Sequence, residues 1–172
     1  MNIRLFEQQD AAAIADLLNR YLPFEEENEE TVKAADGIRF ICEDNGQIIG
    51  YIAGIEVANT YEEMPYFTEQ LADLHEKAAS CKTVYTTHLV VHPAYRGAGI
   101  GRQLVAAYME EVKRQAELLI VVGWVQSDTG IWDAEGLFVK AGLKPFQYIE
   151  RYFEAYQVYC PNCKGSCYCD AH

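Results

Sequence analysis

Residues 87–107 constrain the fold more than any other segment, because three kinds of local structure follow one another there without a gap. The apolar run Leu89-Val90-Val91 precedes the glycine-rich stretch Arg96-Gly97-Ala98-Gly99-Ile100-Gly101. Apolar residues then recur at the spacing of a buried helix face, at Leu104, Val105 and Tyr108. The segment therefore predicts a strand, a glycine loop and a helix N-terminus in immediate succession.

Such an arrangement is suited to binding an anion. The first turn of a helix has backbone N–H groups without intrahelical partners, and the helix dipole favours negative charge there. Glycines let the backbone close around a phosphate without clashes from Cβ atoms. Arg96 adds a fixed positive charge. We therefore expect a phosphate-bearing ligand at this loop.

Two common phosphate loops do not fit the spacing. A Walker loop ends in Gly-Lys followed by Ser or Thr, but Gly101 is followed by Arg102 and Gln103. A dinucleotide fingerprint requires G-x-G-x-x-G, and no glycine occupies the third position here. An ordinary turn between a strand and a helix needs fewer glycines than this loop has, and it needs no arginine.

The stretch 96–101 matches the pattern R/Q-x-x-G-x-G/A, and residues 89–95 are similar to a strand that leaves through V-x-P-x-Y-R-G. In both respects the chain resembles the GNAT superfamily of N-acetyltransferases over residues 1–149. The resemblance implies that acetyl-coenzyme A is the cosubstrate and that its diphosphate lies on the glycine loop. The coenzyme-binding residues that it implies are Leu89, Val90, Val91, Arg96, Gly97, Ala98, Gly99, Ile100, Gly101, Arg102 and Phe138.

The proton donor to the departing thiolate departs from the family's pattern. Family members often carry a tyrosine in the segment that corresponds to 134–143, but the matching position holds Phe138, which cannot donate a proton. Tyr148 and Tyr152 are the candidates nearest in sequence. A thiolate that leaves unaided, or a chain without catalytic activity, remains open.

The general base is equally open. Where some family members carry a glutamate on the strand before the loop, this chain has Tyr85. Glu56, near the end of the preceding strand, is the candidate for a base or an amine ligand. A water chain acting on an amine that arrives neutral is the alternative.

The order of the predicted elements indicates an α/β (α+β) fold. We expect a mixed, mainly antiparallel central sheet of six to seven strands with helices on both faces, as in the GNAT fold. Asn45-Gly46 between two apolar runs predicts a hairpin, and Asp10 is the expected N-cap of the first helix. The later predictions are a helix in an insertion over 61–80, a buried strand over 118–125, a helix over 130–141 and strand-like structure over 143–159.

Composition limits the partners. The formal net charge of −12 over 172 residues argues against nucleic acid and suits cationic amines. Without an apolar run of transmembrane length, we expect no membrane span and a cytoplasmic protein. The length favours one acetyltransferase domain, 1–159, followed by a cysteine-rich tail, 160–172.

The tail places five soft ligands within a few residues of one another. C-x-x-C followed by C-x-C and a histidine is compatible with a zinc site built from four of these five residues: Cys160, Cys163, Cys167, Cys169 and His172. A cuprous site, disulfides and free thiols in a disordered tail are the alternatives.

The sequence thus predicts an acetyl-coenzyme A-dependent N-acetyltransferase that acts on a primary amine of a small molecule or a peptide. Two other classes stay open. They are a coenzyme A-binding sensor without turnover and an interaction protein whose working part is the metal-binding tail. Edge strands near the C-terminus are also compatible with a homodimer.

Overall fold

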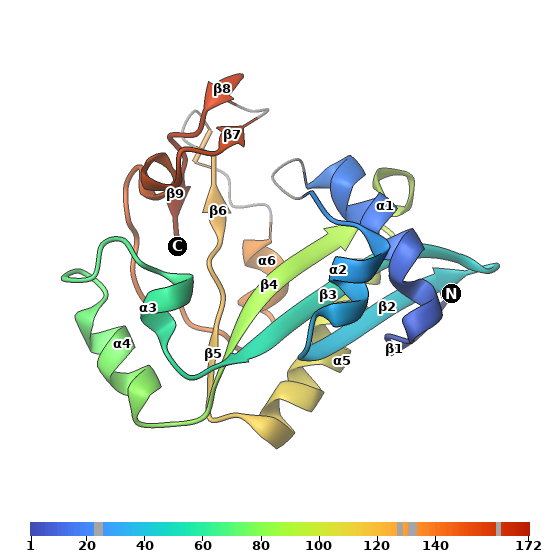
Figure 1. Cartoon of the computed structure of the whole chain (residues 1–172), viewed down its shortest axis with the longest axis horizontal. Helices are drawn as coiled ribbons and strands as arrows, with labels where there is room; N and C mark the ends of the chain where they lie inside the picture. The colour runs from blue at the N-terminus through green and yellow to red at the C-terminus, as the bar shows by residue number, and fades with distance from the viewer. Residues whose placement is uncertain (23–25, 127–128, 131–133, 161–162) are drawn as a thin grey trace. The chain divides into compact units, whose positions relative to one another are not determined.

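The computed structural model describes residues 1–22, 26–126, 129–130, 134–160 and 163–172 (Figure 1). Its strands are β1 (Asn2–Leu5), β2 (Ile38–Asp44), β3 (Gln47–Val57), β4 (Thr83–Val91), β5 (Leu118–Ile120), β6 (Trp124–Val125), β7 (Tyr159–Cys160), β8 (Gly165–Ser166) and β9 (Asp170–Ala171). Its α-helices are α1 (Ala11–Tyr21), α2 (Glu29–Ala34), α3 (Thr60–Glu63), α4 (Ala72–Ala79), α5 (Ile100–Gln115) and α6 (Glu135–Phe138). Its 3₁₀-helices are η1 (Gln8–Asp10), η2 (Pro93–Tyr95) and η3 (Tyr152–Tyr156).

The chain divides into two compact units. Unit 1 comprises Met1–Ile55 and Thr86–Arg114, and unit 2 comprises Glu56–Tyr85 and Gln115–His172. No helix of the described residues combines the length and the apolar composition that crossing a bilayer requires.

The central sheet has the mixed, mainly antiparallel character that the sequence predicts. Its strand order is β1-β2-β3-β4-β5, with β1 and β3 antiparallel to β2 and with β5 parallel to β4. Within the described residues it holds five strands, so the expected six to seven are too many. The remaining strands form two separate pairs, β6 with β9 and β7 with β8.

The hairpin predicted from Asn45-Gly46 joins β2 to β3. Asn45 has φ +49° and Gly46 has φ +79°, and two successive residues of positive φ make a turn whose twist matches that of the flanking strands. The register slips by one residue between Cys42 and Glu43, which leaves Ile49 of β3 without a partner in the ladder. The local turn chemistry therefore accounts for the antiparallel pairing of β2 with β3.

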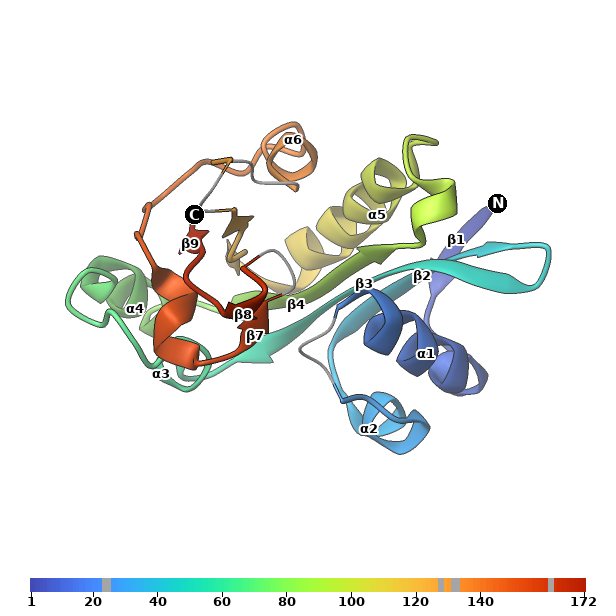
Figure 2. The ribbon, with the colours of Figure 1, turned by 90° about the horizontal axis from the view of Figure 1, so that it is seen from above.

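Helices cover both faces of the sheet in unit 1, as predicted. Figure 2 shows α1 and α2 on one side of β2 and β3 and α5 on the other. On the first side, Ile14 and Leu18 of α1 pack in one buried cluster with Ile41 and Tyr51 of the strands. On the other side, a Cβ atom on Gly50 would lie 2.9 Å from Leu104 Cδ1, so the glycine lets α5 approach β3 closely.

Asp10 does not cap α1 in the way the sequence suggests. Its carboxylate makes no hydrogen bond to the first turn of that helix. It accepts instead from the backbone N–H of Glu7, at 2.8 Å, and pairs with Arg4. The 3₁₀-helix η1 precedes α1 without a break, and the carboxylate closes that turn.

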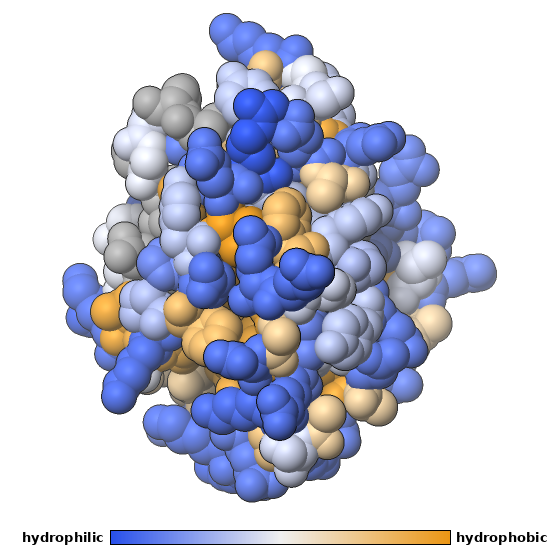
Figure 3. Space-filling model, turned by 90° about the vertical axis from the view of Figure 1, so that its left-hand side faces the viewer, coloured by the Kyte–Doolittle hydropathy of each residue, from blue (hydrophilic) through white to orange (hydrophobic). Residues whose placement is uncertain are grey.

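Unit 2 has its own buried cluster, to which α4, β5, η3 and β9 contribute. Met64, Leu71, Ile120, Ile149 and Tyr152 are among its members. The helix predicted around residues 71–78 is confirmed as α4. Figure 3 views the side on which α3, α4 and the C-terminus lie in Figure 1; hydrophilic side chains predominate there, and the hydrophobic ones form a smaller area between them.

Three later predictions differ from the structure. The strand expected over 118–125 is two short strands, β5 and β6, because the first pairs with β4 and the second with β9. Of the helix expected over 130–141, α6 is the described part, and residues 131–133 lie outside the described residues. The strand-like structure expected over 143–159 is largely irregular and contains η3, since the aromatic residues of that stretch pack at helical spacing.

The cysteine-rich tail is part of the fold of unit 2. Trp124 pairs with Ala171 and Val125 with Asp170, and Ile149 forms a further bridge to Ala171. Cys160 pairs with Gly165 in the β7–β8 hairpin. The boundary between a domain 1–159 and a tail 160–172 stays a prediction.

Candidate functional site

The end of β4 leads into a tightly held turn. Val90 is buried in the cluster of unit 1, and the backbone N–H of His92 donates to the carbonyl of Ile49, at 2.8 Å. The His92 ring then accepts from the N–H of Ala94, at 3.2 Å, and so caps η2. These bonds fix the direction in which the chain leaves the sheet.

Arg96 follows η2 with its side chain exposed. Its Nε donates to the carbonyl oxygen of Val91, at 3.2 Å, which holds the guanidinium beside the end of β4. Within the described residues it has no acidic partner. A cation that is positioned but not neutralised is suited to hold a phosphate.

The glycines of the loop serve the backbone and not the packing. Gly97 has φ +79° and Gly99 has φ +81°, in the region that other residues rarely adopt. A Cβ atom on either glycine would have nothing within 4 Å. The space beside both glycines is therefore open. Glycines that served only to let a strand pack tightly against a helix would have atoms close by.

The first turn of α5 presents unpaired donors. The first backbone hydrogen bond of the helix runs from the N–H of Gln103 to the carbonyl of Gly99, at 3.1 Å. The amides of residues 97–102 have no hydrogen-bond acceptor in the part of the chain that the structure describes. Together with the helix dipole, they form a surface suited to an anion.

The rest of α5 is anchored so that this surface stays in place. Ile100 and Leu104 are buried, and both approach Gly50 of β3. Further along the helix, the buried hydroxyl of Tyr108 lies 3.1 Å from that of Thr86 in β4. Leu89, Val90, Val91 and the loop 96–102 all lie within unit 1, and their role in binding the coenzyme stays a prediction.

The catalytic candidate Glu56 lies at the start of unit 2. Its Oε2 lies 2.9 Å from Nζ of Lys82, and both side chains are largely exposed. An exposed pair of this kind holds its geometry weakly. The other carboxylate oxygen of Glu56 is not part of this ion pair.

The tyrosine candidates have different surroundings. The exposed hydroxyl of Tyr148 donates to Asp170 Oδ2, and this bond with the carboxylate raises the pKa of Tyr148 to about 12. Tyr152 is buried, with its hydroxyl 2.7 Å from that of Tyr156. Burial raises the pKa of Tyr152 as well. A phenol whose pKa is raised is a weaker proton donor, so neither environment favours general acid catalysis.

Phe138, the residue at the family's tyrosine position, is 2% exposed. It ends α6, and its carbonyl oxygen accepts from the N–H groups of Ala141 and Leu143. The assignments of Glu56, Tyr148 and Phe138 stay predictions.

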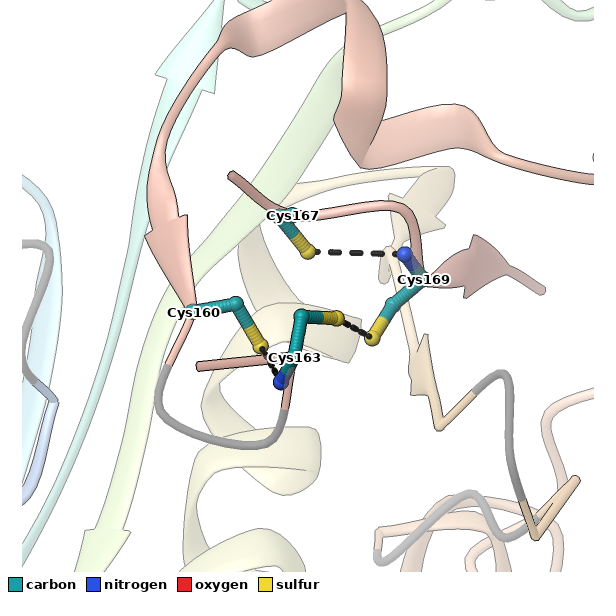
Figure 4. Close-up of side chains that lie close together, drawn as sticks. All are labelled: Cys160, Cys163, Cys167 and Cys169. Atoms are coloured by element: carbon teal, nitrogen blue, oxygen red, sulfur yellow. Dashed lines mark hydrogen bonds between the residues drawn. The ribbon is translucent and has the colours of Figure 1, made fainter. Parts of the chain in front are cut away.

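Four cysteines of the tail converge in unit 2 (Figure 4). The sulfur atoms of Cys160, Cys163, Cys167 and Cys169 all lie within 4.8 Å of one another. His172, the fifth predicted ligand, is not part of this group. Its ring lies 6.2 Å from that of Tyr148, and its backbone pairs with Gly123.

Two features of unit 2 were not predicted from the sequence. Asp170 accepts from both the Tyr148 hydroxyl and the backbone N–H of Arg151. His75 is buried and stacked on Tyr61, with its Nδ1 2.7 Å from the hydroxyl of Thr60. Both arrangements join residues far apart in the chain, for which the sequence offers no periodic or spacing signal.

Comparison with known proteins agrees with this geometry. The family model described as acetyltransferase (GNAT) domain matches residues 35–142, which include the whole loop. No curated protein matches the sequence significantly.

Solved structures share the fold at low sequence identity. The ribosomal-protein-S18-alanine N-acetyltransferase from Escherichia coli is 19% identical, with a TM-score of 0.65 over 99% of this chain and 88% of that one. NAA60 from Arabidopsis thaliana, in complex with acetyl-CoA, is 13% identical, with a TM-score of 0.68 over 99% and 94%. YncA from Salmonella typhimurium, a putative acetyltransferase with its cofactor acetyl-CoA, is 18% identical, with a TM-score of 0.63 over 99% and 90%. By the match of its glycine loop, its sheet and most of its length, the chain belongs to the GNAT family of acetyltransferases.

Proposed function

We propose that the protein transfers the acetyl group of acetyl-coenzyme A to a primary amine of a small molecule or a peptide. The observation that carries the proposal is the loop 96–102, in which unpaired amides, open glycines and an unneutralised arginine lie at the start of α5. Solved structures of the same fold contain acetyl-coenzyme A, which supports the choice of ligand.

In this proposal the diphosphate of the coenzyme lies on the amides of residues 97–102, with Arg96 as the cation. The pantetheine arm then pairs with backbone groups of Leu89 to Val91. β4 pairs with β5 at Thr83 to Tyr85, and this pairing ends before Leu89. The neutral amine attacks the thioester carbonyl directly, the carbon–nitrogen bond forms as the carbon–sulfur bond breaks, and coenzyme A leaves as its thiolate. The proton that the nitrogen loses goes to a base, for which Glu56 is the candidate, or to water. Orientation of the two reactants supplies much of the rate.

Calorimetry with free and acetylated coenzyme A tests the binding step. We expect heat with both ligands, and we expect Arg96→Glu to weaken both by about a hundredfold, since a charge-assisted contact becomes a repulsion. Reversal of the exposed Arg20, which pairs only with Asp16 among the described residues, is the matched control. Equal affinity in the wild type and Arg96→Glu would contradict the proposal.

A thiol-release assay over a panel of amines tests turnover. Release of coenzyme A that depends on an amine supports the transferase. Binding of the coenzyme without release from any amine would favour the sensor, to which the replacement of a tyrosine by Phe138 gives some ground.

The assignment of Glu56 has its own test. If its carboxylate accepts the amine proton, Glu56→Gln lowers kcat by about a hundredfold or more. Lys82→Ala, which removes the partner and keeps the carboxylate, should leave kcat nearly unchanged.

The homodimer and the cytoplasmic location stay predictions. Analytical ultracentrifugation measures the oligomeric state directly.

A further inference from the structure

The four cysteines of the tail surround a single point (Figure 4). All four sulfur atoms lie within 4.8 Å of one another, and those of Cys163 and Cys169 are 3.5 Å apart. Zinc binds thiolates at about 2.3 Å in a tetrahedron, whose edges are then ~3.8 Å. The observed spread is close to that tetrahedron.

The backbone around the cluster donates to the sulfur atoms. The N–H of Cys163 points at Cys160 Sγ and that of Cys169 at Cys167 Sγ, each at 3.5 Å. Each bond joins the two members of one cysteine pair. Hydrogen bonds of this kind stabilise negative charge on sulfur and orient metal ligands.

The two pairs come from different segments of the tail, one on each side of β8. Cys160 ends β7, and Cys163 follows in the turn to β8, where Lys164 has φ +55°. Cys167 and Cys169 follow β8 and lead into β9. Strands of two residues hold together weakly without further support, so a central ion would explain why this segment has a defined fold.

We propose that Cys160, Cys163, Cys167 and Cys169 bind one Zn²⁺ ion as four thiolates. Each sulfur faces three others instead of a single partner, which favours a shared ion over two disulfides. Four sulfur ligands in a tetrahedron are typical of zinc, whereas hard cations prefer oxygen. Three of the cysteines are buried and all four positions are filled by protein, so the site is structural.

The chain that leaves the site binds a neighbouring segment of unit 2. The carbonyl of Cys169 accepts from the N–H of Phe153, at 3.1 Å. The next residue, Asp170, holds the N–H of Arg151 at 2.7 Å, and Ala171 bridges to Ile149. The zinc thus fixes the segment 149–153 against the tail.

Metal analysis of the whole chain, purified under reducing conditions without chelator, tests the proposal. We expect about one zinc per chain in the wild type and in Cys81→Ser, which alters a cysteine outside the cluster. Cys163→Ser and Cys169→Ser should lose the ion. His172→Ala should keep it, because that ring is not part of the group.

A second measurement does not depend on the folding of the variants. Cobalt exchanged into the wild type should give the strong visible bands of tetrahedral thiolate coordination. Titration of the thiols with an organomercurial should release zinc in proportion. Removal of zinc should abolish protection from hydrogen exchange at Phe153 and Ala171 while the amide of Ile41 in β2 stays protected.

The proposal is wrong if the reduced wild type binds neither zinc nor cobalt, if His172→Ala loses the ion, or if the native protein has two disulfides by mass. Coenzyme binding measured on the same samples separates this inference from the proposed function, since the loop 96–102 lies in unit 1. A protein that contains zinc but gives no heat with coenzyme A in calorimetry would contradict the proposed function and leave the zinc site intact.

Discussion

Asp10 shows how one buried carboxylate can serve several groups. Arg4 meets it with both terminal nitrogens, at 2.7 and 2.8 Å, and reaches Glu43 as well, at 3.0 Å. The same carboxylate closes η1 by accepting from Glu7. The bonds join β1, β2 and the start of α1, so Asp10 holds a corner of unit 1 together.

We expect Asp10→Asn to lower the free energy of unfolding by about 2 kcal/mol at neutral pH, because a charge-assisted pair becomes a neutral bond. Urea denaturation measures the change. Asp16→Asn, which removes an exposed partner of Arg20, should cost less than about 0.5 kcal/mol. Equal costs in the two variants would contradict the role given to Asp10.

The same pair sets a dependence on acid. The guanidinium of Arg4 lowers the pKa of the Asp10 carboxyl from its ordinary value. The stability from the pair is therefore present above about pH 4, the unfolded-state pKa, and lost as the pH falls through the lower folded-state pKa. In Asp10→Asn that part of the acid dependence should disappear.

Gly97 offers a test of the coenzyme loop with an internal control. Gly97 and Gly46 share φ +79°, and a Cβ atom on either has nothing within 4 Å. Alanine at either position should therefore cost about 1 kcal/mol of stability. Gly97→Ala should also lower the affinity for coenzyme A by about tenfold in calorimetry, because the added methyl group would lie where the ligand approaches.

Gly46→Ala lies in the β2–β3 hairpin and should leave the affinity unchanged. A matching loss of affinity in both variants would mean that Gly97 acts only through stability.

The coenzyme loop illustrates what a sequence can show about single residues. Positive φ and a helix start are local requirements, so the residue types alone reveal them. The pairing of Tyr148 with Asp170 is not local, and the sequence does not show it.

Among the elements, predictability follows the distance between partners. The hairpin at Asn45-Gly46 and the helix α4 depend on neighbours in the chain, and both are confirmed. The run 118–125 is continuous in hydropathy, but its two halves pair with β4 and with β9. Hydropathy alone does not reveal such a change of partner.

The strand-like structure predicted for the aromatic stretch 143–159 was wrong for a related reason. Its aromatic composition suggested a strand, yet Tyr152 and Tyr156 meet at the spacing of one helical turn. Phe153 stacks on Trp124 of β6, with ring centroids 3.7 Å apart. Packing against a distant strand therefore decided the conformation of η3.

The insertion that carries α3 and α4 should be sensitive to acid through His75. Burial lowers the pKa of His75, and its Nε2 has no hydrogen-bond partner within the described residues. The unfolded state therefore binds the proton more tightly than the folded state does. The stability that neutral His75 allows is complete above about pH 6.5, the unfolded-state pKa, and it declines as the pH falls toward the lower folded-state pKa.

The protection factors of the α4 amides, which are exchange rates divided into the intrinsic rates at the same pH, should fall in the wild type from about pH 7 to about pH 5. His75→Phe keeps an aromatic ring beside Tyr61 and removes the titration, so its protection factors should depend less on pH. An identical pH dependence in the two proteins would show that another group is responsible.

For the whole molecule, the net charge of −12 opposes the approach of an anionic coenzyme. The loop counters this charge only locally, with Arg96 and Arg102. Raising salt from ~10 mM to ~100 mM shortens the Debye length from about 30 to about 10 Å, which screens the distant carboxylates more than the contacts of the loop. We therefore expect the association rate of coenzyme A to rise with salt, as measured by stopped-flow fluorescence. Pantetheine, which carries no phosphate, should show no such trend, and a rate for the coenzyme that falls with salt would mean that the local field of the loop dominates.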